Sequence, residues 1–178
     1  ENSFYSIKEM PISFRFSILV ARRVYRKIGH KILDKNNMEN YKKSGKIYVM
    51  ISDGECQEGT TWESLLIASK HKLDNLVIIV DYNKLQALSK LNDALPLDSL
   101  SKKFKAFNCN CVEIKNGHSF TSIYKSFKKI KKNNKPNIFI VHTIKGKGIK
   151  EFENDTVWHA RQLKGQEIII GKKRLGIK

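Results

Sequence analysis

The sequence predicts an α/β fold: a doubly wound parallel β-sheet with helices on both faces. Two observations predict it. Short apolar runs rich in β-branched residues, typical of buried strands, alternate with longer segments whose apolar residues recur at helical spacing. This alternation is the pattern of βαβ units, in which helices connect parallel strands and cover the sheet. The 178 residues, 40% of them hydrophobic, can form a packed core of about one domain.

The first half of the chain is predicted to hold two helices and two strands. Residues 14–33 carry apolar side chains at roughly helical spacing. The run at 47–52 is a strand because it is short, apolar and β-branched, and it ends at Asp-Gly. Residues 62–71 form a helix that can turn Trp62 inward, and the run at 76–81 is a second buried strand.

The second half continues the alternation. Helices are predicted at 97–107 and 120–132, the latter with a clear apolar face that Pro136 ends. Strands are predicted at 111–114 and 137–144. We therefore expect one domain over residues 1–163 with an incomplete amino end, followed by a basic tail, 164–178, to which the pattern assigns no structure.

The chain is strongly basic, with a formal charge of +17. Its lysines are scattered, many on polar faces of predicted helices, whereas nucleic-acid binding favours a basic stripe with interleaved aromatic side chains. We interpret most of the charge as solvated surface with non-specific polyanion affinity, and expect no specific nucleic-acid partner. Residues 51–100 are the exception, with 4 basic and 8 acidic side chains.

Several features predict a cytoplasmic location without a membrane partner. The sequence has no run of eighteen apolar residues and no secretory signal at its start. Three cysteines, Cys56, Cys109 and Cys111, are too few and oddly numbered for a disulfide framework, which indicates a reducing compartment. Cys109-x-Cys111 lacks the second ligand pair of a zinc site, and His118 is interpreted as a turn residue.

Candidate ligand-binding residues lie where the strands at 47–52 and 76–81 end. Asp53 and Gly54 follow the first strand, and Asp81 and Asn83 close the second. Open parallel sheets bind ligands beyond the carboxyl ends of their strands, so these residues can converge. A carboxylate, an amide oxygen and a backbone carbonyl suit Mg²⁺, and Gly54 lets a diphosphate approach the turn. The alternative is that both segments are plain turns.

The segment SDGECQEG…DYNKLQ, residues 52–86, resembles the thiamine-diphosphate motif of transketolases, which runs from Gly-Asp-Gly to Asn-x-x-Gln. Segments 95–108, 116–118 and 142–163 are similar to the same family. The Trp-Glu variant of the motif resembles the separately encoded amino-terminal subunit of two-subunit transketolases. The resemblance covers about residues 13–163 and implies the thiamine-diphosphate-binding fold.

The resemblance implies site residues position by position. Asp53 and Asn83 match the side-chain ligands of Mg²⁺, and Leu85 matches the residue whose backbone carbonyl is the third protein ligand. His159 matches a histidine that contacts the cofactor diphosphate and the reacting end of the substrate. The cofactor-binding residues implied are Ser52, Asp53, Gly54, Glu55, Asn83, Leu85 and His159.

Catalytic roles are implied for His159 and Glu58. Glu58 and Glu63 match acidic residues of the subunit interface, near glutamates that relay protons between paired sites. Lys145 and Lys147 lie near the site entrance and receive a weak positioning role. For Glu58, Glu63 and the two lysines, an ordinary surface role is an equally open alternative.

The sequence also departs from the family. Ile12, Arg15 and Ser17 stand where glycines pack against the cofactor, and Ser52 also replaces a glycine. Side chains at such positions obstruct close approach. Ser89 and Asn108 replace usual glycines on loops, and the roughly one hundred residues that precede this region in the family are absent. An incomplete, a degenerate and a repurposed chain are all open alternatives.

The function implied is that of a transketolase subunit that binds thiamine diphosphate and Mg²⁺ and contributes half of an active site. That site would transfer a two-carbon ketol unit from a ketose phosphate to an aldose phosphate, as in the pentose phosphate pathway. The expected partner is a transketolase carboxyl-terminal, pyrimidine-binding subunit or domain, contacted around Glu58, Trp62 and Glu63 in a hetero- or homo-oligomer. The alternatives are a non-catalytic scaffold subunit and a polyanion-binding module.

Overall fold

The computed structural model describes residues 45–87, 89–159 and 161–177. The helix predicted at 14–33, and with it Ile12, Arg15 and Ser17, lies outside the described residues. Four strands form a single parallel sheet in the order β1-β2-β4-β3. They are β1 (Ile47–Ser52), β2 (Leu76–Tyr82), β3 (Asn110–Ile114) and β4 (Asn137–His142). The predicted α/β fold with a parallel sheet is confirmed.

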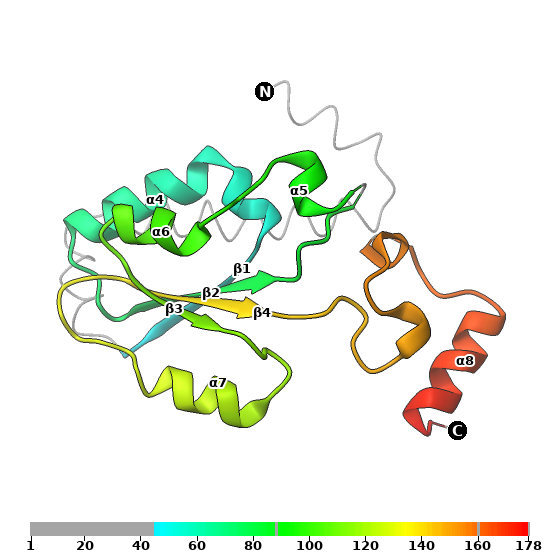
Figure 1. The fold of residues 1–178 in the computed structure, drawn as a ribbon. Coiled ribbons are helices and arrows are strands. Elements are labelled where there is room, and N and C mark those ends of the chain that lie inside the picture. The colour runs from blue at the N-terminus through cyan, green and yellow to red at the C-terminus, as the bar shows by residue number, and fades with distance from the viewer. Residues whose placement is uncertain (1–44, 88, 160, 178) are drawn as a thin grey trace. The chain divides into compact units, whose positions relative to one another are not determined.

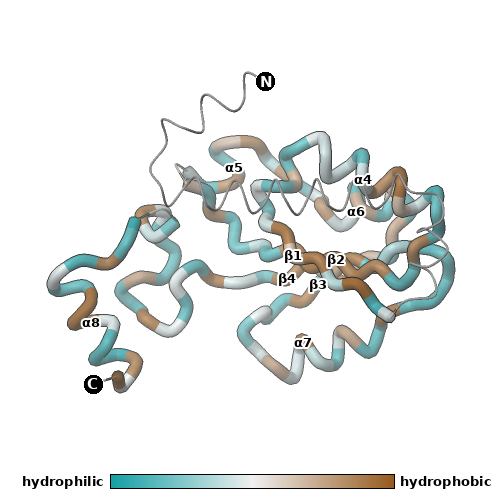
Figure 2. Tube along the Cα trace, turned by 180° about the vertical axis from the view of Figure 1, so that it is seen from behind, coloured by the Kyte–Doolittle hydropathy of each residue, from teal (hydrophilic) through white to brown (hydrophobic). Residues whose placement is uncertain are grey.

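Helices cover both faces of this sheet. On one face lie α4 (Gly59–Lys70), α5 (Leu91–Ala94) and α6 (Leu100–Ala106), and α7 (Phe120–Phe127) lies on the other (Figure 1). Successive strand residues point to opposite faces, so each strand supplies both cores. Figure 2 shows that the hydrophobic residues are concentrated along the strands.

Strand β2 contributes side chains to the core on each face of the sheet. Val80 is fully buried against Leu65 of α4 and Phe104 of α6. Val77 is fully buried on the other face, where Phe127 of α7 packs. Side chains thus pack on both faces of the sheet near the ends of β1 and β2. This packing fixes where the loops that follow these strands begin.

Helix boundaries differ from the prediction for local reasons. Helix α4 begins at Gly59, before the predicted start at Trp62. The prediction missed this first turn because its residues are polar and give no apolar signal. The helix predicted at 97–107 corresponds to α6, which begins only at Leu100 because Ser99 has a left-handed φ of 55°. The short helix α5 was not predicted, and Pro96 follows it.

Helix α7 and strand β4 are shorter than predicted. Helix α7 ends at Phe127 because the chain then turns, and the Asn137 side chain binds both the N–H and the C=O of Lys131. Ile130 still packs on the core beyond the end of the helix. Strand β4 ends at His142, whose carbonyl oxygen accepts a hydrogen bond from the N–H of Gly117 instead of extending the sheet.

The basic segment after residue 163 forms a helix, α8 (Gln166–Leu175). It follows two short 3-10 helices, η2 (Lys150–Phe152) and η3 (Thr156–His159). Gly171 is buried in α8, and the side chains of Ile149 and Phe152 approach it; Arg174 pairs with Glu151. The predicted domain boundary at 163 stays a prediction. Within the described residues, no helix is long and apolar enough to cross a membrane.

Candidate cofactor and metal site

The loops after β1 and β2 lie side by side at one edge of the sheet. The strand register pairs Ser52 with Asp81, and the N–H of Asp53 donates to the Asp81 carbonyl over 3.2 Å. The N–H of Lys84 donates to Asp53 Oδ2 over 2.7 Å. These bonds join the segment that begins at Asp53 to the segment that contains Asn83 and Leu85.

Asp53 is a buried carboxylate, with 1% of the residue exposed. Burial raises its pKa; hydrogen bonds from the N–H groups of Lys84 and Gly54 oppose that rise, and the charge of Asp81 adds to it. Among the described residues, no Lys, Arg or His forms an ion pair with Asp53. A buried carboxylate without a paired cation is unfavourable, and a divalent cation would compensate it.

The loop after β2 supplies uncharged oxygen atoms that could bind a metal ion. Asn83 Oδ1 accepts from the N–H of Leu85 at 2.9 Å, and its Nδ2 donates to Asp81 Oδ2 at 3.3 Å. Asp81 also accepts from the Thr143 hydroxyl. Asn83 is thereby oriented from both ends, while its amide oxygen keeps a second lone pair. Leu85 is buried, and an isolated bridge to Lys90 orders its backbone.

Ser52 and Glu55 interact with each other. Glu55 Oε2 accepts from both the N–H and the hydroxyl of Ser52, at 2.8 and 3.0 Å. This arrangement closes the 3-10 turn η1 (Gly54–Gln57) that leads into α4. Gly54 has room for a side chain: the nearest atom to an added Cβ is Gln86 Nε2, at 3.6 Å. Packing therefore does not require glycine there.

Glu58 and Glu63 are exposed at the start of α4. The Glu58 carboxylate accepts a long hydrogen bond, 3.5 Å, from the Thr60 hydroxyl. Trp62 is turned inward, and its predicted contact with a partner stays a prediction. Its ring packs on Phe104 and Phe107, with centroids 5.3 and 4.9 Å away, and its Nε1 donates to the Cys56 carbonyl over 2.9 Å. Trp62 is thus half-buried and packs against the core on this face of the sheet.

His159 lies beside Lys145, to which the sequence analysis assigned only a weak positioning role. Lys145 Nζ lies 3.3 Å from His159 Nδ1. Partial burial and the charge of Lys145 lower the pKa of His159, which favours the neutral imidazole. The Lys145 charge also opposes the rise in the pKa of Asp53, so this ammonium group acts on both residues. The neighbouring Trp158 ring packs on Phe152, 4.4 Å between centroids.

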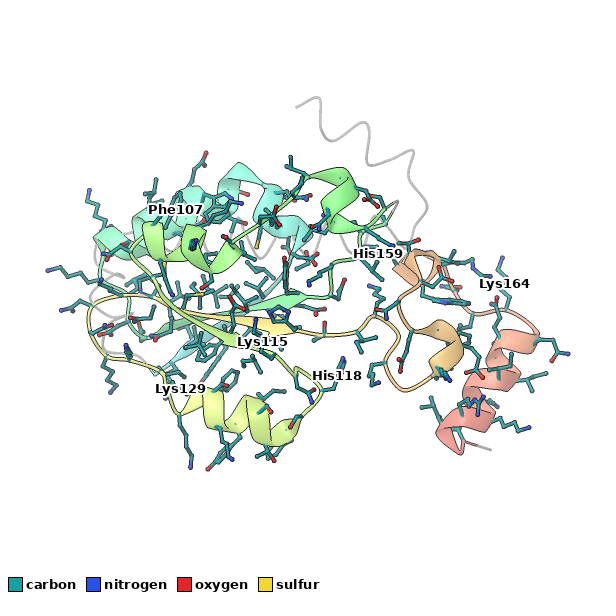
Figure 3. The ribbon with its side chains drawn as sticks, in the orientation of Figure 1. Phe107, Lys115, His118, Lys129, His159 and Lys164 are labelled. Atoms are coloured by element: carbon teal, nitrogen blue, oxygen red, sulfur yellow. The ribbon has the colours of Figure 1, made fainter. Side chains whose placement is uncertain are left out.

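A cavity of about 520 Å³ opens at this edge of the sheet, on the side of α7. Asp81, Asn83, His118 and Lys145 contribute its polar lining. Figure 3 shows His118 at the same end of the sheet as the segment that carries His159.

Among the described residues, no group of three or more His, Cys, Asp and Glu could hold a metal. Of Asp53, Asn83 and Leu85, only Asp53 is one of these four residue types. The other two would bind a metal through an amide oxygen and a backbone carbonyl, so the absence of such a group does not bear on them.

Comparison with known proteins identifies the family. The sequence model described as "Transketolase, thiamine diphosphate binding domain" matches residues 21–178. The chain belongs to this transketolase family. It is 42% identical over 137 residues to an apulose-4-phosphate transketolase subunit of Actinobacillus succinogenes, covering 75% of this chain and 49% of that protein. It is 36% identical over 122 residues to human transketolase, covering 68% of this chain and 19% of that one.

Solved transketolases share the fold. The crystal structure of the Campylobacter jejuni transketolase superposes with a TM-score of 0.69 at 31% identity, covering 76% of this chain and 21% of that chain. The family member described here therefore spans at most about half the length of these relatives. The predicted family and its thiamine-diphosphate-binding fold are confirmed.

Proposed function

We propose that the chain binds thiamine diphosphate together with Mg²⁺ and supplies the diphosphate side of a ketol-transferring active site. Asp53, Asn83 and the carbonyl of Leu85 would hold the metal ion. Gly54 and His159 would lie beside the cofactor diphosphate. A two-carbon ketol unit would pass from a ketose phosphate to an aldose phosphate in the complete assembly.

The observation that carries this proposal is the buried carboxylate of Asp53, which no described Lys, Arg or His pairs with and which lies next to a second acid, Asp81. Two backbone N–H groups fix the orientation of the Asp53 carboxylate. Its remaining lone pairs, with the oriented amide oxygen of Asn83, form a hard oxygen set with a single negative charge. Such a set suits Mg²⁺, which takes its other ligands from phosphate and water.

The other residues have assignable tasks. When bound, thiamine diphosphate supplies the nucleophilic carbon needed to break and form the carbon–carbon bonds. Lys145 would hold His159 through Nδ1, so that Nε2–H of the neutral imidazole donates a hydrogen bond to an anionic or hydroxyl oxygen. Thr143 would hold Asp81 in place and leave Asn83 correctly aimed.

Calorimetric titration tests this assignment. The full chain is titrated with thiamine diphosphate in Mg²⁺ and again in EDTA, and we expect saturable binding only with Mg²⁺. Asp53→Asn retains the acceptor for the Lys84 N–H but lacks the charge, so we expect affinity to fall at least about tenfold, roughly 1.4 kcal/mol. Asp93→Asn removes the same charge from an exposed position on α5 and serves as the control.

Equal affinity in Asp53→Asn and the wild type would remove the metal assignment. Failure of the wild type to bind the cofactor, alone or with a transketolase carboxyl-terminal subunit, would favour the scaffold alternative. Two relatives are named as single subunits of a transketolase, which supports a two-subunit assembly for this chain. A cytoplasmic location remains part of the proposal.

A further inference from the structure

The turn that leads into α7 carries a histidine that reaches the loop after β4. His118 Nε2 accepts a hydrogen bond from the N–H of Ile144 over 2.7 Å. The next residue along that loop, Lys145, places its Nζ 3.3 Å from His159 Nδ1. Figure 3 shows His118 and His159 at the same end of the sheet, on segments that are far apart in the sequence. The proposed function assigns no task to His118.

The turn itself is fixed against the end of β4. The N–H of Gly117 donates to the His142 carbonyl over 2.8 Å. The Asn116 side chain accepts from the N–H of His118 over 3.1 Å. The packing leaves no spare room, since a Cβ added to Gly117 would lie 2.5 Å from Val141 Cγ1 and 2.7 Å from the His142 carbonyl oxygen. The imidazole of His118 therefore starts from a fixed backbone, and its Nε2 is an acceptor of defined position.

The loop that receives this bond lies beyond the last residue of β4. The N–H of Ile144 donates to His118, and its carbonyl oxygen accepts from the N–H of Lys147 over 3.2 Å. These two bonds orient the peptide groups on both sides of the Ile144 Cα. They therefore fix the direction in which the chain enters Lys145.

The bond also defines what the His118 ring can do. A ring nitrogen that accepts a hydrogen bond carries no proton, so the proton of the neutral imidazole is on Nδ1. His118 and Lys145 both line the cavity of about 520 Å³. While the bond to Ile144 holds, however, Nε2 cannot exchange a proton with a ligand in that cavity. A positioning task fits this geometry better than a role in proton transfer.

We propose that His118 is a positioning residue, which fixes the backbone at Ile144 and thereby holds the Lys145 ammonium group beside His159. Partial burial and the Lys145 charge lower the pKa of His159, so displacement of the lysine would raise that pKa. The placement of Lys145 by His118 is independent of any ligand. Its benefit to cofactor binding rests on the proposed function, in which His159 lies beside the diphosphate.

Two variants of the full chain test the inference. His118→Gln keeps an acceptor, because the amide oxygen of glutamine reaches about as far as Nε2, whereas His118→Phe keeps a planar ring without an acceptor. NMR titration of His159, without metal or cofactor, is the measurement. We expect the pKa of His159 to rise in His118→Phe and to stay at the wild-type value in His118→Gln. Circular dichroism checks the fold, and His118→Ala takes the place of a phenylalanine variant that does not fold.

A double-mutant cycle shows whether the effect passes through the lysine. Lys145→Gln should by itself raise the pKa of His159, because it removes the positive charge. In that background His118→Phe should cause no further rise, since no ammonium group is left to displace. A further rise in the double variant, no rise in His118→Phe alone, or an equal rise in His118→Gln would overturn the inference.

Calorimetric titration with thiamine diphosphate and Mg²⁺ separates this inference from the proposed function. If both hold, His118→Phe should weaken cofactor binding by about tenfold, as the loss of a residue that orients a ligand contact does. His118→Gln should weaken it less. A raised pKa of His159 with unchanged cofactor affinity would support the positioning role of His118 and would remove His159 from the proposed cofactor site.

Discussion

At the residue scale, the site depends on groups whose environment differs from what their type alone suggests. Asp53 follows a strand, as many turn aspartates do, yet it is buried and faces a second acid. Asn108, at a position where the resemblance implies a glycine, has a φ of 60°, which asparagine tolerates better than most residues.

The raised pKa of Asp53 has a consequence for stability. The folded chain binds this proton more tightly than the unfolded chain, so the free energy of unfolding falls as pH rises from about 4 through the raised pKa. Without metal, Asp53→Asn should therefore be more stable than the wild type at pH 7, and the gain should vanish near pH 3. Urea unfolding of both proteins from pH 3 to 8 measures this difference. A variant that is less stable at pH 7 would contradict it.

Gly54→Ala separates folding from binding. An added Cβ has no contact shorter than 3.6 Å, so we expect the free energy of unfolding to change by less than about 1 kcal/mol. If a diphosphate approaches this backbone, the same methyl group should weaken Mg²⁺-dependent binding of thiamine diphosphate at least tenfold. Thermal denaturation and calorimetry on the same sample provide both values. Unchanged affinity would show that the diphosphate lies elsewhere.

At the scale of elements, the loop after β4 positions Lys145 and His159. Gly146 has a φ of +75°, and an added Cβ would lie 2.2 Å from the Phe152 carbonyl oxygen. The loop therefore closes tightly on η2. In the same way, Gly117 lies against Val141 and His142, so that the turn carrying His118 reaches the end of β4.

Gly146→Ala should therefore destabilise the fold by about 2–4 kcal/mol, from the left-handed φ and the clash together. It should also displace Lys145 from His159 and raise the pKa of that histidine. Gly148→Ala is the matched control: its φ is +109°, but no atom lies within 4 Å of an added Cβ. Chemical denaturation and NMR titration of His159 follow both effects. Equal destabilisation by the two variants would exclude the clash.

At the scale of the whole molecule, charge is segregated along the chain. The stretch from Lys115 to Lys150 carries ten lysines and no acidic residue, whereas residues 51–100 carry the acidic excess. Glu58 and Glu63 are exposed on α4, as an interface with a partner subunit would require. Trp62 packs half-buried against the core, and its contribution to that interface stays a prediction.

We expect the chain alone to show no ketol transfer and to gain stability from a transketolase carboxyl-terminal subunit of the same source. The interface should bury more than about 1,000 Å² in total. Light scattering of the mixture, with turnover of a ketose phosphate and an aldose phosphate, measures both effects. Glu58→Gln/Glu63→Gln should weaken the complex, and Asp93→Asn should not. Full turnover by the chain alone would refute the half-site proposal.

The four strands, the longer helices between them, the parallel sheet and the family could be predicted from the amino-acid sequence, whereas α5 and α8 could not. Buried strands and the motif from Asp53 to Leu85 are local signals, carried by neighbouring residues. The folded structure was needed to show that Lys145 lies beside His159, that Trp62 packs on Phe104 and Phe107 and that Lys84, Lys115 and Lys147 line one cavity. These contacts join residues far apart in the chain, and periodicity carries no information about such distances. The helix boundaries at Gly59 and Phe127 were missed for a related reason, since side-chain hydrogen bonds and turns, not apolar spacing, set them.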